Sequence, residues 1–150
     1  MDTSIATMTP CKLGFVPHEA LRDLCARFPR IAGALWRETL IDASIFREWV
    51  TNVGQRPAFS RIAHVMCELV VRFQAVGLAE GYSIPFPITQ TEVGDATGLS
   101  NVHVNRSIQA LRGQGLISLE DSTLTVPDWR RLTQAADFNP MYLHSRVAAA

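Results

Sequence analysis

The chain has 150 residues, 47% hydrophobic and 19% charged, a composition that can bury a core and excludes a disordered protein. Its 14 Lys and Arg residues balance its 14 Asp and Glu residues, which excludes a strongly basic nucleic-acid-binding protein, so any DNA contact must depend on local chemistry. No apolar run approaches the roughly 20 residues that span a bilayer, and no signal peptide is recognisable, so we expect a soluble, cytoplasmic protein without membrane contacts.

The N-terminal part of the chain predicts small elements. Residues 5–16 alternate loosely between apolar and polar side chains and contain Pro10 and Gly14, which predicts one or two short strands. A strand pair of this size cannot stand alone in water, so it must pack on a later segment or on something that precedes Met1. Residues 17–28 then predict a short helix with one apolar face.

Residues 29–52 predict a long helix, because Pro29 suits the first turn of a helix and Gly54 lies just beyond its end. Two apolar stripes run along this helix, and two stripes need two partners. One partner can be the protein's own core and the other a second copy of the same helix; the alternative is a fully buried central helix. The first stripe, our candidate dimerisation set, contains Ile31, Leu35, Ile41, Ile45 and Trp49, and the second contains Trp36, Leu40, Ala43, Phe46 and Val50.

A further helix is predicted over residues 61–75, followed by a loop and a short edge strand around Ile84. Two short helices should follow. Thr89 and Glu92 have the spacing of a capping box at the start of the first, and Gly98 suits its end. Ser100 can cap the second helix only two residues later, so the two helices should cross steeply.

The second of these short helices, residues 101–112, has a polar face that points away from the core. Val104, Ile108 and Leu111 recur at helical spacing and should point inward. The outward side carries Asn101, Val102, His103, Asn105, Arg106 and Gln109. It contains no acidic residue, and its amide and guanidinium groups can read base edges in the major groove of DNA. The alternative is a helical hairpin with a solvated polar face.

The segment after the helix pair favours DNA binding over that alternative. Residues 115–119 predict a strand, residues 120–122 a turn and residues 123–126 a return strand. Helix, turn, helix and hairpin, in that order, make a winged helix. Glu120 and Asp121 at the tip of this wing would be repelled by phosphate.

Residues 88–106, with Leu111-Arg112 and Gly115-Leu116-Ile117, resemble the Crp/Fnr superfamily of bacterial transcription regulators. The resemblance extends to the long helix, to the helix after it and to the tail over 126–144. It implies a mainly α fold with small β elements, in which a long dimerisation helix precedes a winged helix-turn-helix domain. The corresponding domains are a remnant of the effector domain (1–28), the dimerisation helix (29–56) and the DNA-binding domain (57–150).

The resemblance also implies a function, namely sequence-specific binding of a homodimer to a palindromic DNA duplex, with RNA polymerase as a further candidate partner. The recognition helix would be Asn101–Arg112. Expected base contacts are Asn101, Val102, His103, Asn105, Arg106 and Gln109, and expected phosphate contacts are Thr89, Gln90 and Ser100. Val102 stands where many members carry a base-reading Glu, whereas the guanine-pairing Arg is retained as Arg106.

Other features separate this chain from effector-sensing members of that family. Most of the effector-binding β-barrel is missing, and the phosphate cassette of cyclic-nucleotide binders and the N-terminal cysteines of iron–sulfur sensors have no counterpart. Because the three cysteines lie far apart, at Cys11, Cys25 and Cys67, we expect no metal and no other cofactor.

Two other kinds of function compete with DNA binding. A shortened regulator could act as a dimerisation module without useful DNA affinity. A small hydrolase could use Cys67 and His64, which lie three residues apart on one helix face. That region reads as core, however, and no oxyanion loop is visible, so we expect no enzyme.

Overall fold

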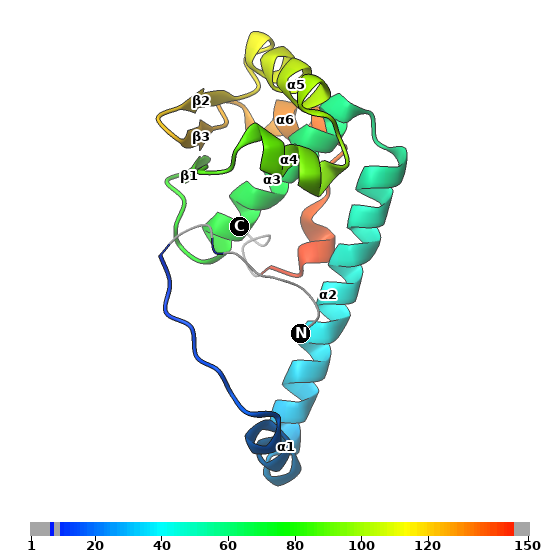
Figure 1. The fold of residues 1–150 in the computed structure, drawn as a ribbon, viewed down its shortest axis with the longest axis vertical. Helices are drawn as coiled ribbons and strands as arrows, with labels where there is room; N and C mark the ends of the chain where they lie inside the picture. The colour runs from blue at the N-terminus through cyan, green and yellow to red at the C-terminus, as the bar shows by residue number, and fades with distance from the viewer. Residues whose placement is uncertain (1–6, 8–9, 146–150) are drawn as a thin grey trace. The chain divides into compact units, whose positions relative to one another are not determined.

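The computed structural model describes residues 7 and 10–145, which are mainly helical with one small sheet, as predicted (Figure 1). The helices are α1 (His18–Arg27), α2 (Pro29–Gln55), α3 (Ala58–Ala75), α4 (Gln90–Thr97), α5 (Asn101–Gly113) and α6 (Trp129–Ala136), with a terminal 3-10 helix η1 (Pro140–Leu143). The strands are β1 (Ser83–Pro85), β2 (Ser118–Glu120) and β3 (Thr123–Thr125). None of the helices in the described ranges is long and apolar enough to cross a membrane.

Residue contacts divide the chain into two compact units, residues 1–43 and 44–150. The first unit contains α1 and the first half of α2. The strands predicted within residues 5–16 are absent from its described part, because residue 7 and residues 10–16 adopt no regular structure. Leu13 is 70% and Phe15 91% exposed, so these described residues neither pair with a sheet nor pack against one. Residues 5, 6, 8 and 9 lie outside the described residues.

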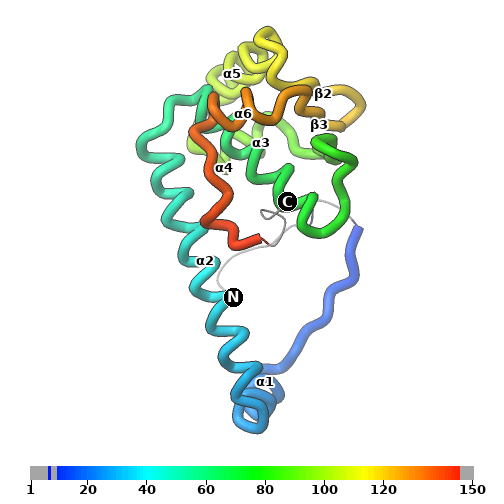
Figure 2. The backbone as a smooth tube through the Cα atoms, turned by 180° about the vertical axis from the view of Figure 1, so that it is seen from behind, coloured from blue at the N-terminus to red at the C-terminus, as the bar shows by residue number. Residues whose placement is uncertain are grey.

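Helix α3 is the centre of the second unit. Ten of its side chains are buried, and it packs against α5 and α6, which lie beside it in both views (Figures 1 and 2). The core continues into both neighbours through Leu111 of α5 and Leu132 of α6, neither of which is exposed to solvent. This packing fixes α5 on a rigid support, so its outward side chains have defined positions.

The three strands form an antiparallel sheet in the order β1-β3-β2 (Figure 1). Leu124 of β3 pairs with Ile84 of β1 and Leu119 of β2, and the first two are fully buried. The β2–β3 hairpin is the predicted wing. Asp121 and Ser122 turn it with two successive positive φ angles, 46° and 55°, which matches the twist of the flanking strands.

The second half of α2 turns one of its apolar stripes toward the core of the second unit. Ile45 packs against that core, and Trp49 Nε1 donates a hydrogen bond of 3.2 Å to Glu68 Oε1. These two members of the candidate dimerisation set therefore face the chain's own core. The opposite stripe is free of the second unit, with Phe46 72% and Val50 73% exposed. Of the other candidates, Ile31 and Ile41 are half-buried and Leu35 is exposed.

A buried polar cluster ties α2, α3 and η1 together. Tyr142 of η1 donates to Glu68 Oε2 at 2.6 Å, so its oxygen is free to accept from His64 Nε2 at 3.0 Å. Burial, together with the positive charge of Arg56, lowers the pKa of His64, and the ring is neutral in the folded protein. Glu68, only 3% exposed, also accepts from Arg72 Nε at 2.8 Å. Glu68, which also accepts from Trp49 of α2, thereby links η1 to both α3 and α2.

Removing the central hydroxyl of this cluster tests its contribution. Tyr142→Phe leaves a buried imidazole N–H and a carboxylate oxygen each without a partner, so the free energy of unfolding should fall by about 1–3 kcal/mol. Urea denaturation followed by circular dichroism measures this change. Tyr82→Phe is the control, because Tyr82 is 41% exposed and water can replace its hydroxyl contacts. Equal stability of the two variants would mean that the cluster contributes nothing to stability.

Candidate nucleic-acid interface

The capping box predicted at the start of α4 is present. Thr89 Oγ1 accepts from the Glu92 backbone N–H at 3.2 Å, and the Glu92 carboxylate accepts from the Thr89 backbone N–H at 2.7 Å. The Thr89 hydroxyl also donates to Glu92 Oε2 at 2.7 Å, and these bonds lower the pKa of Glu92. Because a hydroxyl has one proton, Thr89 cannot donate to a phosphate while it holds Glu92. Its predicted phosphate contact therefore competes with capping.

The turn between α4 and α5 also forms as predicted. Gly98 ends α4 in the left-handed conformation, with φ 66° and ψ 31°, which glycine adopts without a steric penalty. The turn and α5 then lie so close to α4 that a Cβ atom at Gly94 would be 2.7 Å from the Leu99 carbonyl oxygen in the turn and 3.6 Å from Val104 Cγ2 of α5. This crossing requires glycine at position 94.

Gly94→Ala should therefore lower the free energy of unfolding by about 1–3 kcal/mol, because the Leu99 backbone must move to admit the methyl group. Thermal or urea denaturation measures the loss. Gly113→Ala is the matched control, since a Cβ at Gly113 meets nothing within 4 Å and alanine favours the helix. If Gly94→Ala were as stable as the control, the close crossing of α4 and α5 would be wrong.

Arg61 of α3 holds this helix pair against the end of α2. Its Nη1 donates to the Thr97 carbonyl at 2.9 Å, and its Nη2 donates to the Arg56 carbonyl at 2.9 Å. Both acceptors are carbonyl groups near helix ends, where no intrahelical partner is left for them. One guanidinium thus satisfies both ends and fixes α4 relative to α2. The sequence does not single out Arg61, because an arginine in an amphipathic helix gives no sign of its partner.

Helix α5 presents the predicted polar face. Val104, Ile108 and Leu111 are buried on its inner side. All six outward candidates are exposed: Asn101, Val102, His103, Asn105, Arg106 and Gln109. Five of them line one shallow hollow, with His103 outside it. The face therefore exists as a continuous surface, and its contact with bases stays a prediction.

The first turn of α5 differs from the prediction in one respect. Ser100 occupies the N-cap position, but its side chain caps no backbone N–H; its Oγ lies 3.0 Å from His103 Nδ1 instead. The first backbone N–H groups of α5 cannot bond within the helix, so they are available to an anion. The Ser100 residue beside them is exposed, and its contact with phosphate stays a prediction.

Two side-chain hydrogen bonds join α5 to the start of α4. The sequence gives no sign of them. Asn101 Nδ2 donates to Thr91 Oγ1, and Asn105 Nδ2 donates to Gln90 Oε1, both at 3.3 Å. They link residues 10 and 15 positions apart, and helical periodicity carries no information about such pairs. One expected phosphate contact, Gln90, is therefore hydrogen-bonded to one expected base contact, Asn105.

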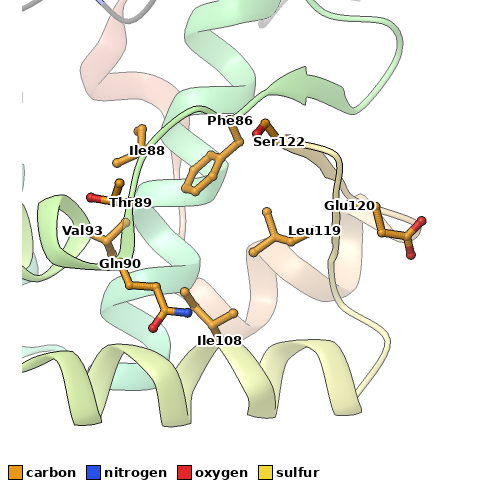
Figure 3. Close-up of a pocket in the computed structure, with 9 residues that line it drawn as sticks. All are labelled: Phe86, Ile88, Thr89, Gln90, Val93, Ile108, Leu119, Glu120 and Ser122. Carbon is orange, nitrogen blue, oxygen red and sulfur yellow. The ribbon is translucent and has the colours of Figure 1, made fainter.

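The wing and the helix pair enclose a small pocket (Figure 3). Phe86 and Leu119 point into it and Glu120 points away from it (Figure 3). Its wall is completed by Ile88, Thr89, Gln90, Val93, Ile108 and Ser122. The acidic wing tip predicted from the sequence is thus exposed, and its carboxylates face solvent beside the candidate interface.

Comparison with known proteins identifies this arrangement. The Crp-like helix-turn-helix domain matches residues 60–135, just over half of the 150 residues. The chain belongs to the Crp/Fnr family. It carries the helix-turn-helix domain of that family, as the sequence resemblance indicated.

Relatives within the Crp/Fnr family agree. The chain is 29% identical over 123 residues to the transcriptional activator protein FnrL of Cereibacter sphaeroides, covering 79% of this chain and 50% of the relative. It is 24% identical to the nitrogen fixation regulation protein FixK of Azorhizobium caulinodans, covering 79% and 48%. The structure of FixK2 from Bradyrhizobium japonicum superimposes with a TM-score of 0.72 at 21% identity, covering 80% and 59%. This chain spans about half the length of the curated relatives it matches.

In this Crp/Fnr-family chain, the two residues considered for catalysis lie in the core. His64 and Cys67 are both 0% exposed, and burial raises the pKa of the Cys67 thiol, which therefore stays protonated and unreactive. His64 is bonded to Tyr142 and not to Cys67. The names of the relatives describe a transcriptional activator and a nitrogen fixation regulation protein.

Proposed function

We propose that the chain binds duplex DNA sequence-specifically as a homodimer, with α5 in the major groove. The observation that carries this proposal is the outward face of α5, which is exposed, rich in amide and guanidinium groups and free of carboxylates. Such groups match the donor and acceptor pattern that base pairs display in the major groove. We propose that residues 57–150 form the DNA-binding domain, residues 29–56 the dimerisation helix and residues 1–28 the remnant of an effector domain.

The roles of individual side chains follow from their chemistry. Arg106 can pair with guanine O6 and N7, Asn105 can pair with adenine, and Val102 can contact only an apolar group, such as the thymine methyl. Asn101, His103 and Gln109 supply further base-edge contacts, and Gln90 and Ser100 contact phosphate. Thr89 supports phosphate binding mainly by capping α4. The first turn of α5 adds unpaired backbone N–H groups, which favour an anion.

A homodimer is supported by the outward stripe of α2. Trp36, Ala43 and Val50 recur every seven residues, and Phe46 and Val53 each follow three residues after one of them. This is the spacing of a coiled-coil seam. Phe46 and Val50 are large apolar side chains exposed to solvent in the single chain, and a second copy of α2 would cover them. Two copies would present two α5 helices, which suits a palindromic site.

Selection of bound sequences from a random duplex library tests the proposal directly. We expect an enriched palindrome whose half-sites are about one helical turn apart, bound with strong salt dependence. The neutral net charge of the chain makes low salt the appropriate starting condition. If no sequence is enriched and gel shifts at low salt show no binding, the chain is a dimerisation module without useful DNA affinity.

A further inference from the structure

Gln90 and Asn105 form one connected pair at the candidate DNA surface. Gln90 is the first residue of α4, and its side chain extends toward α5 (Figure 3). There its Oε1 accepts a hydrogen bond of 3.3 Å from Asn105 Nδ2. Both residues are exposed, on the same side as the face we assign to DNA. A phosphate-facing group is therefore bonded to a base-facing group.

The chemistry of two amides makes this bond directional. Each amide has one carbonyl acceptor and two N–H donors. With the Gln90 carbonyl committed to Asn105, the Gln90 NH2 group remains free, and an NH2 group is what a phosphate oxygen accepts from. If both amides flipped, the Gln90 carbonyl would point at the phosphate and be repelled. Phosphate binding therefore favours the orientation seen in the structure.

Asn105 in this orientation keeps its Oδ1 and one N–H free. Adenine requires that combination in the major groove, because its N6 group donates and its N7 atom accepts. We propose that Gln90 is a positioning residue, which passes the orientation set by a DNA phosphate to the Asn105 amide and thereby selects adenine at one position of each half-site. This inference rests on the proposed DNA-binding function.

The pair should matter more in the complex than in the free protein. In the free protein, water competes with an exposed amide–amide bond. When α5 enters the groove, water leaves, and a hydrogen bond in this less polar setting becomes stronger. Immobilising Asn105 before binding also reduces the side-chain entropy lost on contact with the base.

Three substitutions separate positioning from phosphate contact. Gln90→Ala removes both the acceptor for Asn105 and the donor to phosphate. Gln90→Glu keeps the acceptor but loses the donor and adds a negative charge. Asn105→Ala removes the base contact itself. Gln134→Ala is the matched control, a surface glutamine on α6 outside the interface.

The measurement is equilibrium binding of each full-length variant to the selected duplex and to its single-base-pair substitutions. We expect Gln90→Ala and Asn105→Ala each to lose about tenfold of the preference at the same base pair. A variant that combines Gln90→Ala with Asn105→Ala should lose no more of this preference than Asn105→Ala alone. Gln90→Glu should bind every duplex more weakly yet keep that preference. Gln134→Ala should match the wild type.

Two results would overturn the inference. If the wild type discriminates among the duplexes and Gln90→Ala keeps the full preference at the Asn105 base pair, Gln90 does not position Asn105, although DNA binding stands. If Gln90→Ala and Asn105→Ala instead lose preference at different base pairs, the two residues act independently. Absence of specific binding by the wild type would overturn the proposed function and this inference together.

Discussion

Replacing Phe46 and Val50 together with glutamate should convert the protein from dimers to monomers. Both side chains are large, apolar and exposed on the single chain, and they occupy the proposed seam of α2. Two glutamates in each copy would place four carboxylates along that seam. Burying unpaired charges costs several kcal/mol, which is more than a short helix seam can supply. The substitutions leave the other stripe of α2, which contacts the chain's own core, unchanged.

The same double variant should lose most of its affinity for the palindromic duplex. A dimer binds the second half-site as an intramolecular event, which raises affinity on the order of a hundred- to ten-thousand-fold over a single half-site. Sedimentation velocity measures the oligomeric state, and fluorescence anisotropy measures affinity for duplexes with one or two half-sites. Gln55→Glu is the control, because it adds a negative charge to an exposed position of α2 away from the seam.

Two outcomes would contradict the proposal that the outward stripe of α2 is the dimer seam. The wild type could sediment as a monomer at micromolar concentration, or the double variant could remain a dimer. Retained circular dichroism and an unchanged unfolding midpoint show that the variant is folded. Loss of folding in the double variant would mean that these side chains stabilise the single chain, against the exposure seen in the structure.

The helix pair and the wing could be predicted from the sequence because their signals are local. The capping box joins Thr89 to a residue three positions away, and the left-handed conformation of Gly98 depends only on its own backbone. The wing turn at Asp121 follows from polar residues between two short apolar runs. The resemblance that names the family lies in these same segments.

Features that depend on distant contacts could not be predicted. Both stripes of α2 are apolar, so hydropathy alone could not show that Ile45 faces the chain's own core. The bond between Gln90 and Asn105 and the contacts of Tyr142 with α3 join residues that no periodicity relates. The strands expected within residues 5–16 followed from alternation, but a strand needs a partner strand, and the described residues of that stretch have none.

Arg106→Ala should weaken binding to the selected duplex by about 1–3 kcal/mol and relax the preference for guanine at one position of each half-site. The guanidinium is exposed on α5, opposite the buried side chain of Val104. Its planar fork matches guanine O6 and N7, whereas the three N–H donors of a lysine ammonium have no fixed fork geometry. Arg106→Lys should therefore keep most of the attraction to DNA and lose most of the preference for guanine.

Val102 and Thr89 provide the contrast that gives this prediction its meaning. Val102 lies one turn before Arg106 and is 66% exposed. Its apolar side chain can select thymine by contacting the methyl group of that base. Val102→Glu should therefore shift the preference toward cytosine, whose amino group donates a hydrogen bond to a carboxylate. Thr89→Ala removes the cap of α4 and should weaken binding to all duplexes alike, because phosphate-side contacts carry no base information. Binding of each variant to single-base-pair substitutions of the selected duplex measures all three effects. If Arg106→Ala and Thr89→Ala produced the same uniform loss, the face of α5 would not read bases, and its assignment to the major groove would be wrong.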